Sequence, residues 1–431
     1  MMRLIWLLQS YWRTRRLRFA SRADLESYQR RQLSRFIDRL CARSRYFGPY
    51  RNLPLEQWPG MDKALMIEHF DAMNTAGVRL APAMEAAMAA EHSRDFTPAV
   101  GGITVGLSSG TSSQRAVFAV SPREKAQWAG VMLAKALPDG LFSGERVALF
   151  LRSNSNLYAA VRTPWLTFSF YDLFQPFETL CAELVAYQPS VIVAPAQVLR
   201  QLALGVIAGR LALAPKKVIS VAEVLEPQDH TLIVQAFGAV HEIYQATEGF
   251  LASTCERGVL HLNEEYVHVE PQWLDEEQRR FVPVITDFTR ITQPIVRYRL
   301  DDILVARSKP CPCGRVTRAI EGIEGRCDDM LVLPSVRDGG TVAVFADVLT
   351  RAFAQALPPD ADYRLVQQGD AALLLHAARN EIELAALRDH LVCVLRGLGV
   401  AVDRLQWTLS STLPAFDPTK KRRRITRHAI S

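Results

Sequence analysis

"SVIVAPAQVLRQLALGVIAGRLALAPKKVISVA", residues 190–222, places a helical pattern between two short apolar runs. The runs "SVIVAPA" (190–196) and "KKVISVA" (216–222) are apolar at most positions, as strands covered on both faces of a parallel sheet are. The intervening "AQVLRQLALGVIAGRLA" (196–212) repeats apolar residues three and four positions apart, which predicts a helix. Strand, helix and strand in this order predict an α/β fold with a parallel sheet.

The pattern changes on both sides of this unit. Residues 1–95 have mostly helical periodicity, and "RVALFLR" (146–152) predicts another buried strand. Between residues 255 and 320 the runs "YVHVEPQW", "RFVPVITDF" and "DDILVARS" predict a more antiparallel, β-rich layer or subdomain. Beyond residue 326, strands and helices alternate as in a small α+β domain. We therefore expect an N-terminal domain over residues 1–325, with a helical preface (1–95) and a core (96–325), and a small C-terminal α+β domain over residues 326–431.

Composition and charge limit the class of protein. The chain has 431 residues, of which 49% are hydrophobic and 22% charged, which favours a folded protein of two domains. The formal net charge is +6, and much of the excess lies in "YWRTRRLRF" (11–19) and "KKRRR" (420–424). Acidic and basic residues are interspersed through most of the sequence, so we expect no nucleic-acid partner.

Cysteine content and the N-terminal segment indicate the cellular compartment of the protein. Seven cysteines without regular spacing do not describe a small secreted domain, and a cytoplasmic protein is expected. The apolar start is followed by arginines and lacks a small-residue cleavage site, unlike a signal peptide. No run approaches the roughly 20 apolar residues of a transmembrane helix. The first helix is expected to pack on the protein body, with contact to a membrane surface as the alternative.

The stretch "GLSSGTSSQR" (106–115) gathers glycine and hydroxyl residues between two β-branched runs. Such a loop offers N–H and O–H donors at close approach, which a polyphosphate requires. It lacks the Gly-Lys-Ser/Thr ending of the common nucleotide-binding loop. Taken alone, it indicates either a phosphate site or a solvent-exposed turn.

Four further stretches follow in a characteristic order: "YQATEG" (244–249), "VRYRLDDI" (296–303), "EGRCDDML" (324–331) and "DPTKKRRRI" (417–425). Together with the loop, they resemble the motifs of the adenylate-forming (ANL) enzymes, specifically the phenylacetate-CoA ligase-like branch. The resemblance implies a ligase with a large N-terminal domain and a small mobile C-terminal domain. It also implies ATP-dependent activation of a carboxylic acid to an acyl-adenylate, with release of pyrophosphate.

The resemblance implies roles for the phosphate-binding residues. Thr247 would contact the α-phosphate, and Glu248 would bind magnesium, a hard cation that prefers carboxylate and phosphate oxygens. For an isolated Thr-Glu pair, the alternative is a helix cap. Arg115 would supply the positive charge of the lysine that is usual in the family's loop. The β- and γ-phosphates would be held by Ser108, Ser109, Gly110, Thr111 and Ser112.

The resemblance also implies contacts for the rest of the nucleotide. Tyr244 would lie against adenine with Gln245 beside it, and Ala222 and Glu223 would line the base and the acyl pocket. Asp302 would accept hydrogen bonds from both ribose hydroxyls, because a carboxylate has two acceptor oxygens. Its neighbour Asp301 is the alternative.

The C-terminal motifs are expected to supply the hinge and the catalytic lysine. Arg326 would reach the nucleotide, and Asp328 would be the pivot of the small domain. Lys421 would contact the carboxylate and the α-phosphate in the transition state, with Lys420 as the alternative. A solvated basic tail and a nucleic-acid patch are the competing interpretations of this segment.

A second set of residues is independent of ATP. "CERGVLH" supplies Cys255 and His261, and "CPCG" supplies Cys311 and Cys313. Three cysteines and one histidine can form a closed tetrahedral zinc site. Buried thiols are the alternative from spacing alone, and the resemblance favours structural zinc.

The acid and its acceptor are less constrained. Tyr158, Trp165, Phe168, Phe170 and Tyr171 would give an aromatic lining to the acid pocket and favour an aryl acid, although such residues also build cores. A thiol of CoA or of a carrier protein is the expected acceptor. Amide formation, AMP transfer and an idle nucleotide-binding homologue are alternatives, and a homodimer stays open.

Overall fold

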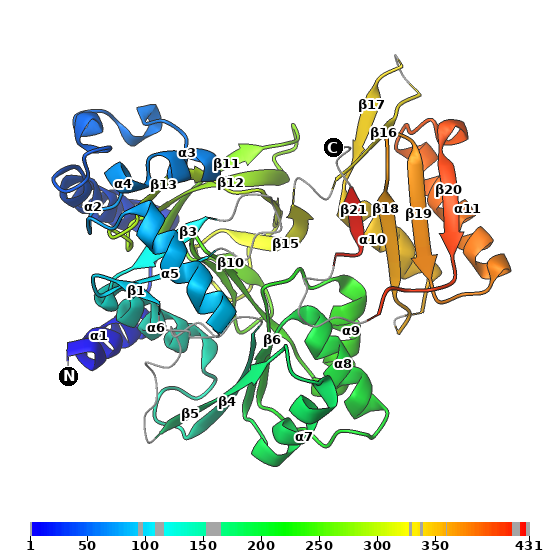
Figure 1. Cartoon of the computed structure of the whole chain (residues 1–431), viewed down its shortest axis with the longest axis horizontal. Coiled ribbons are helices and arrows are strands. Elements are labelled where there is room, and N and C mark those ends of the chain that lie inside the picture. Colours follow the sequence, from blue (N-terminus) through cyan, green and yellow to red (C-terminus); the bar gives the residue numbers. More distant parts are fainter. Residues whose placement is uncertain are drawn as a thin grey trace.

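The computed structural model of the chain describes residues 2–93, 98–107, 116–151, 165–326, 330–336, 339–358, 360–415 and 423–427. Figure 1 shows a large N-terminal part, which ends at β15, beside a smaller C-terminal part that begins at β16. Among the described residues, no helix combines the length and apolarity needed to cross a membrane.

The first 93 residues are mostly helical where the structure describes them, as their periodicity predicts. The helices are α1 (Met2–Arg16), α2 (Arg22–Cys41), α3 (Lys63–Glu68), α4 (Phe70–Met73) and α5 (Leu80–Ser93), with short 3-10 turns at Gly48–Tyr50 and Leu55–Gln57. Helix α1 crosses α6 (Pro122–Ala136) at Gly130, where a Cβ atom would lie 2.3 Å from the carbonyl oxygen of Leu7. Only glycine therefore permits this close crossing.

The stretch 190–222 forms the predicted unit. β6 (Val191–Ala194) and β7 (Lys217–Val221) are parallel neighbours, and α8 (Ala196–Ile207) connects them. Further parallel strands extend the sheet in the order β8-β7-β6-β4-β5. These are β4 (Glu145–Leu151), β5 (Leu166–Asp172) and β8 (His241–Ala246), and α7 (Phe177–Tyr187) and α9 (Pro227–Phe237) complete this region. The prediction of an α/β fold is confirmed.

The β-rich region continues the same sheet and is not a separate layer. After β8 a tight turn reverses the chain into β9 (Gly249–Thr254), so the strands that follow pair antiparallel along one edge of the sheet. They are β10 (Leu260–Leu262), β11 (Val267–Trp273), β12 (Arg280–Asp287), β13 (Ile295–Arg299), β14 (Asp302–Ala306) and β15 (Ala319–Arg326). A small sheet of β1 (Ala99–Val100), β2 (Ile103–Leu107) and β3 (Val117–Val120) packs on α5.

The C-terminal part is α+β, as predicted. A hairpin of β16 (Leu331–Pro334) and β17 (Thr341–Val344) precedes a four-stranded sheet in the order β20-β19-β18-β21. These strands are β18 (Tyr363–Gln367), β19 (Ala372–Ala377), β20 (Gln406–Ser410) and β21 (Ile425–Arg427), covered by α10 (Ala346–Ala356) and α11 (Glu381–Gly397). Phe353, Leu365 and Leu391 belong to a hydrophobic core separate from that of the main sheet.

Candidate active site

A cavity of about 750 Å³ lies between the N-terminal and C-terminal parts. Its walls come from the carboxyl ends of β7 and β8, from the start of β14, from β15, and from α10 and the residues just before β21. Polar groups at the carboxyl ends of parallel strands can converge on a ligand there. Predicted site residues on its walls are Ala222, Glu223, Tyr244, Gln245, Thr247, Glu248, Asp301 and Asp302.

Two of these residues, from separate motifs, are in direct contact. The hydroxyl of Tyr244 on β8 donates a hydrogen bond to Oδ2 of Asp302 on β14, at 2.5 Å. The backbone of Asp302 pairs with Arg326, the last residue of β15. The residues predicted for adenine and for ribose are therefore brought together.

Thr247 and Glu248 form the tight turn between β8 and β9, and not a helix cap. Arg290 fixes the turn by donating a hydrogen bond to the carbonyl oxygen of Thr247 at 2.5 Å. Burial raises the pKa of Glu248, while the Arg290 charge and a hydrogen bond from Tyr298 lower it. The turn thus presents a half-buried carboxylate at the cavity wall.

Tyr298 lies on β13, a strand whose pairing with β12 is irregular. The pairing of β12 with β13 shifts register between Ile285 and Asp287, and Arg297 adopts a φ of 46°. The Arg297 guanidinium donates to the carbonyl oxygens of Glu56 and Trp58, both at 2.6 Å. Bulges of this kind re-aim the neighbouring side chains.

The turn after β7 is also distorted. Ala222 has a φ of 65°, which is uncommon for a residue with a Cβ atom. Next to it, the Glu223 carboxylate accepts hydrogen bonds from the backbone N–H and the side-chain amide of Gln197, both at 3.1 Å. Glu223 therefore satisfies donors at the N-terminus of α8 while it lines the cavity.

Several predicted residues are not tested by these contacts. The phosphate loop Ser108–Ser112 with Arg115, the pivot Asp328, and the lysines Lys420 and Lys421 lie outside the described residues. Gln245 lines the cavity and accepts a hydrogen bond from the Trp128 indole at 3.2 Å.

The aromatic residues predicted for the acid pocket are not found on the walls of the described cavity. Tyr158 lies outside the described residues, and the other four are on or next to β5, the edge strand of the sheet. Tyr171 is buried and stacks on Phe150 with 4.6 Å between ring centroids. Trp165 is half exposed, and none of Trp165, Phe168, Phe170 and Tyr171 lines the cavity defined by the described residues.

A buried cluster of charges joins the two parts of the chain beside the cavity. Arg424, just before β21, pairs with Asp229 on α9 at 3.0 Å, with Asp362 at 3.1 Å, and with Glu226. Arg200 on α8 pairs with the same Asp229 at 2.9 Å. Burial raises the pKa of Glu226 to about 7. The positive charge of Arg424 lowers this pKa, and the negative charges of Asp229 and Asp362 raise it. The sequence motifs gave no signal for this cluster.

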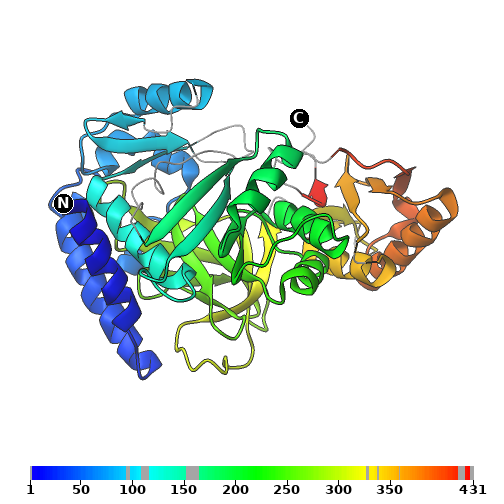
Figure 2. The same ribbon diagram turned by 90° about the horizontal axis from the view of Figure 1, so that it is seen from below.

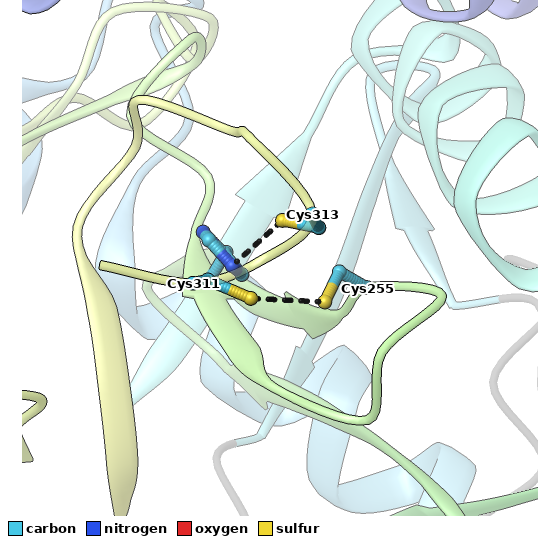
Figure 3. A group of neighbouring side chains, drawn as sticks. Cys255, Cys311 and Cys313 are labelled. Atoms are coloured by element: carbon cyan, nitrogen blue, oxygen red, sulfur yellow. Dashed lines mark hydrogen bonds between the residues drawn. The ribbon is translucent and has the colours of Figure 1, made fainter. Parts of the chain in front are cut away.

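The four predicted metal ligands also converge. Cys255 follows β9, His261 is on β10, and Cys311 and Cys313 are in the loop between β14 and β15, as Figure 3 shows for the cysteines. The Sγ atoms of Cys255 and Cys311 are 3.7 Å apart, and Cys313 Sγ is 3.4 Å from His261 Nε2. All four ligand atoms lie within 4.8 Å of one another.

These distances fit a tetrahedral zinc ion. Zinc bonds of about 2.3 Å to sulfur and about 2.0 Å to nitrogen give tetrahedral edges of roughly 3.5–3.8 Å. A disulfide requires about 2.05 Å between sulfurs and does not match the Cys255–Cys311 pair. His261 Nδ1 lies 3.1 Å from the Thr317 carbonyl oxygen, which favours a proton on Nδ1 and leaves Nε2 as the ligand.

Comparisons with solved structures agree on one fold. A crystal structure of 2-hydroxyisobutyryl-CoA ligase in the postadenylation state, in complex with R3-HIB-AMP, matches with a TM-score of 0.64 and 18% identity over 97% of this chain and 92% of that chain. The acyl acid amido synthetase GH3.15 matches with a TM-score of 0.57 and 12% identity, over 90% of this chain and 86% of that chain. No family model and no curated protein sequence matches. The chain has the fold of the adenylate-forming (ANL) enzymes, as its motifs predict.

The same CoA ligase was also solved in the thioesterification state with 2-HIB-AMP and CoA. That structure matches 99% of this chain and 88% of that chain at 18% identity, but the TM-score is 0.50.

Proposed function

We propose that the protein activates a carboxylic acid with ATP to form an acyl-adenylate. One carboxylate oxygen of the acid forms a bond to the α-phosphorus, and the bond from that phosphorus to the bridging oxygen breaks, releasing pyrophosphate. The observation that carries this proposal is that Tyr244 and Glu248, from one sequence motif, and Asp302, from another, line one cavity in a chain with the adenylate-forming fold.

Nucleotide binding would begin from preformed contacts. Asp302 would accept hydrogen bonds from the ribose, and Tyr244 would lie against adenine. Because the Tyr244 hydroxyl already bonds to Asp302, the carboxylate would be oriented before ATP arrives. Groups fixed in advance lose less conformational freedom when the ligand binds.

Charge on the phosphates would be neutralised from several elements. Glu248 would hold magnesium, and a half-buried carboxylate beside Asp302 suits a hard cation. Bound magnesium would stabilise negative charge on the phosphate oxygens. The Thr247 hydroxyl would contact the α-phosphate, and Arg115 and the loop of Ser108, Ser109, Gly110, Thr111 and Ser112 would hold the outer phosphates.

The C-terminal part would complete the site. Arg423 and Arg424 line the cavity, and Lys421 precedes Arg423 by two residues in the sequence. We propose that the Lys421 ammonium group donates to the carboxylate and the α-phosphate in the transition state, with Lys420 as the alternative. Arg326 would contact the nucleotide and Asp328 would be the pivot between the domains 1–325 and 326–431.

The acid is proposed to be an aryl acid and the acceptor a thiol, of CoA or a carrier protein, in the cytoplasm. Both CoA ligases and amide-forming synthetases share this fold, so an amine acceptor is the second candidate. The aromatic residues of β5 do not line the described cavity. Alkyl and hydroxy acids therefore belong in the panel of test acids.

We also propose that Cys255, His261, Cys311 and Cys313 hold a structural zinc ion. Backbone N–H groups of Arg257 and Arg315 donate to the sulfurs of Cys255 and Cys313, both at 3.4 Å, and such bonds stabilise thiolate ligands. Four protein ligands leave no position for water, so the ion would stabilise the loops and take no part in the chemistry.

Acid-dependent exchange of labelled pyrophosphate into ATP tests the proposal. The purified protein is assayed with aryl, alkyl and hydroxy acids, and Glu248→Gln serves as the matched variant. We expect exchange with at least one acid and a loss of roughly a hundredfold in the variant. Equal exchange by Glu248→Gln would contradict the site assignment. ATP binding without exchange across the whole panel would favour an idle homologue.

A further inference from the structure

Positive charge is concentrated at the start of the chain. The first 51 residues contain 13 arginines, no lysine and three acidic residues, a net charge of +10 against +6 for the whole chain. The rest of the protein is therefore net negative. This asymmetry is confined to α1, α2 and the segment that follows them.

Cations from three helices lie near one another. Arg39 Nε donates a hydrogen bond to the carbonyl oxygen of Arg35 on α2 at 3.1 Å, and the Arg123 guanidinium of α6 lies 6.0 Å from the centroid of the Trp6 ring on α1. Burial lowers the pKa of Arg39 on α2, and the positive charges of Arg123, Arg43 and Arg35 lower it further. Burial and the charge of Arg3 lower the pKa of Lys125 on α6. We call Arg3, Arg35, Arg39, Arg43, Arg123 and Lys125 the basic face.

Acidic side chains of the described part of the chain do not pair with the basic face. Among the residues that the structure describes, none of its six members forms an ion pair with an Asp or Glu side chain. By contrast, Arg22 at the start of α2 pairs with Glu26 and Glu264. Like charges held together repel one another and destabilise the compact state unless an anion is bound.

Large apolar side chains are exposed on α1, which carries one of these cations. On α1, Met2, Leu4, Ile5 and Trp12 have 56%, 50%, 40% and 42% of their surface exposed. Leu7 and Tyr11 are buried and lie on the side of α1 that faces away from Ile5 and Trp12. Met2, Ile5 and Trp12 recur at helical spacing, so they form a second apolar stripe that points to solvent. Arg16 lies over the Trp12 ring at 5.7 Å.

This surface is remote from the candidate active site. Figures 1 and 2 show α1 and α2 at one end of the molecule and the C-terminal part, which forms one wall of the cavity, at the other. A large partner could bind α1 and α2 without closing the cavity. The surface is therefore not a substrate site.

We propose that the basic face and the exposed apolar residues of α1 dock the protein on an anionic lipid bilayer. Met2, Leu4, Ile5 and Trp12 would enter the headgroup region, and the arginines would contact lipid phosphates. Stable peripheral binding needs two signals, and apolar insertion combined with basic charge supplies both. A second copy of the chain would bring like charges together. A nucleic acid would satisfy the cations but leave the apolar stripe in water.

Vesicle flotation of the full chain tests this assignment. One set of vesicles contains phosphatidylcholine alone. In the other set, about a third of the lipid is phosphatidylserine, which is anionic. The variants are Arg35→Gln/Arg39→Gln/Arg43→Gln and Leu4→Ser/Ile5→Ser. The matched control, Arg210→Gln/Arg396→Gln/Arg404→Gln, removes three exposed charges far from α1.

We expect flotation with anionic vesicles only, weakening as salt is added. Each arginine removed from the basic face should reduce the partition coefficient roughly fivefold, and the control should float like the unchanged protein. The Leu4/Ile5 variant should also float less. No variant should unfold at a lower temperature than the unchanged protein, so that lost binding is not lost folding.

Three outcomes would overturn the proposal. The first is no flotation with any vesicle, and the second is equal flotation by the basic-face variant and the control. The third is binding to duplex DNA or to an acidic carrier protein that requires Arg35, Arg39 and Arg43 but ignores Leu4→Ser/Ile5→Ser, in the absence of vesicle binding.

Discussion

Arg424 and Asp229 form a buried ion pair, with 3.0 Å between Nη2 and Oδ1, that joins the C-terminal part to α9 of the N-terminal part. Arg424 lies three residues after Lys421 in the sequence. The same contact that docks the two parts therefore also fixes the chain next to the predicted catalytic lysine. Asp229 is held in place by its second partner, Arg200, at 2.9 Å.

Arg424→Gln should undock the C-terminal part. The substitution leaves Asp229 and Glu226 buried without their main cation, and removing one partner of a buried ion pair costs about 3–5 kcal/mol. Small-angle scattering should show a larger radius of gyration, and pyrophosphate exchange should fall. Arg404→Gln, an exposed arginine of the same part, is the control. An unchanged radius and unchanged exchange in Arg424→Gln would show that the cluster does not control docking.

Tyr298→Phe should weaken magnesium-dependent activity without unfolding the protein. Its hydrogen bond to Glu248 lowers the pKa of that carboxyl, so removing the bond should raise the pKa. The acid limb of the rate profile should move to higher pH, and the magnesium requirement should rise roughly tenfold, since a hydrogen bond to a charged group contributes about 1.5–3 kcal/mol.

Tyr266→Phe is the matched control for Tyr298→Phe. Tyr266 is also buried, and its hydroxyl bonds to Thr14 at 2.7 Å, away from the cavity. The control should lose some stability and keep the magnesium dependence of the unchanged protein. Identical magnesium curves for the two variants would mean that Tyr298 does not position Glu248.

Glu242 should make the protein less stable as pH rises. Burial raises its pKa from 4.5 to about 7, so the folded state binds a proton that the unfolded state has released. Its stabilising contribution is complete below the unfolded pKa and is lost as pH rises through about 7. Glu242→Gln should thus be more stable than the unchanged protein at pH 8, by up to about 3 kcal/mol, and similar at pH about 4.5. Denaturant unfolding at both pH values checks this expectation, and Glu276→Gln, at an exposed position, is the control. The prediction is wrong if the free energy of unfolding of Glu242→Gln differs from that of the unchanged protein by the same amount at both pH values.

Metal analysis tests the Cys/His site directly. Elemental analysis of the purified protein should find one zinc per chain, and Cys311→Ser should lose the zinc and unfold at a lower temperature, since structural zinc contributes to folding free energy. Cys393→Ser, which changes an exposed cysteine, should keep both. A zinc-free protein with unchanged melting would identify the cluster as buried thiols.

Local patterns in the sequence predicted much of the fold. The helical segment between two apolar runs predicts α8 between β6 and β7, because periodicity depends only on neighbouring residues. The sequence also predicted that Cys255, His261, Cys311 and Cys313 come together, and these four side chains do converge. Tyr298 was missed although it lies inside the quoted Arg-Tyr-Arg motif, because its role depends on the bulge at Arg297.

Long-range features were not readable from the sequence. Arg200, Asp229 and Arg424 are spread over more than two hundred residues, and no local pattern marks a cation that will be buried by tertiary packing. Tyr171 was expected near the acid and lies in the core, because alternation along β5 does not reveal what covers each face. The β-rich region was expected as a separate layer, but the turn at Thr247 and Glu248 extends the same sheet.

The most direct test of the central claim compares Lys421→Ala with Lys420→Ala in the pyrophosphate exchange assay, using an acid that the unchanged protein accepts. Loss of one preorganised transition-state donor should slow exchange by roughly a hundred- to a thousandfold in one of the two variants, with Lys421 the expected one, while ATP binding persists. Full exchange by both variants would contradict the proposal that the C-terminal tail completes an adenylate-forming site.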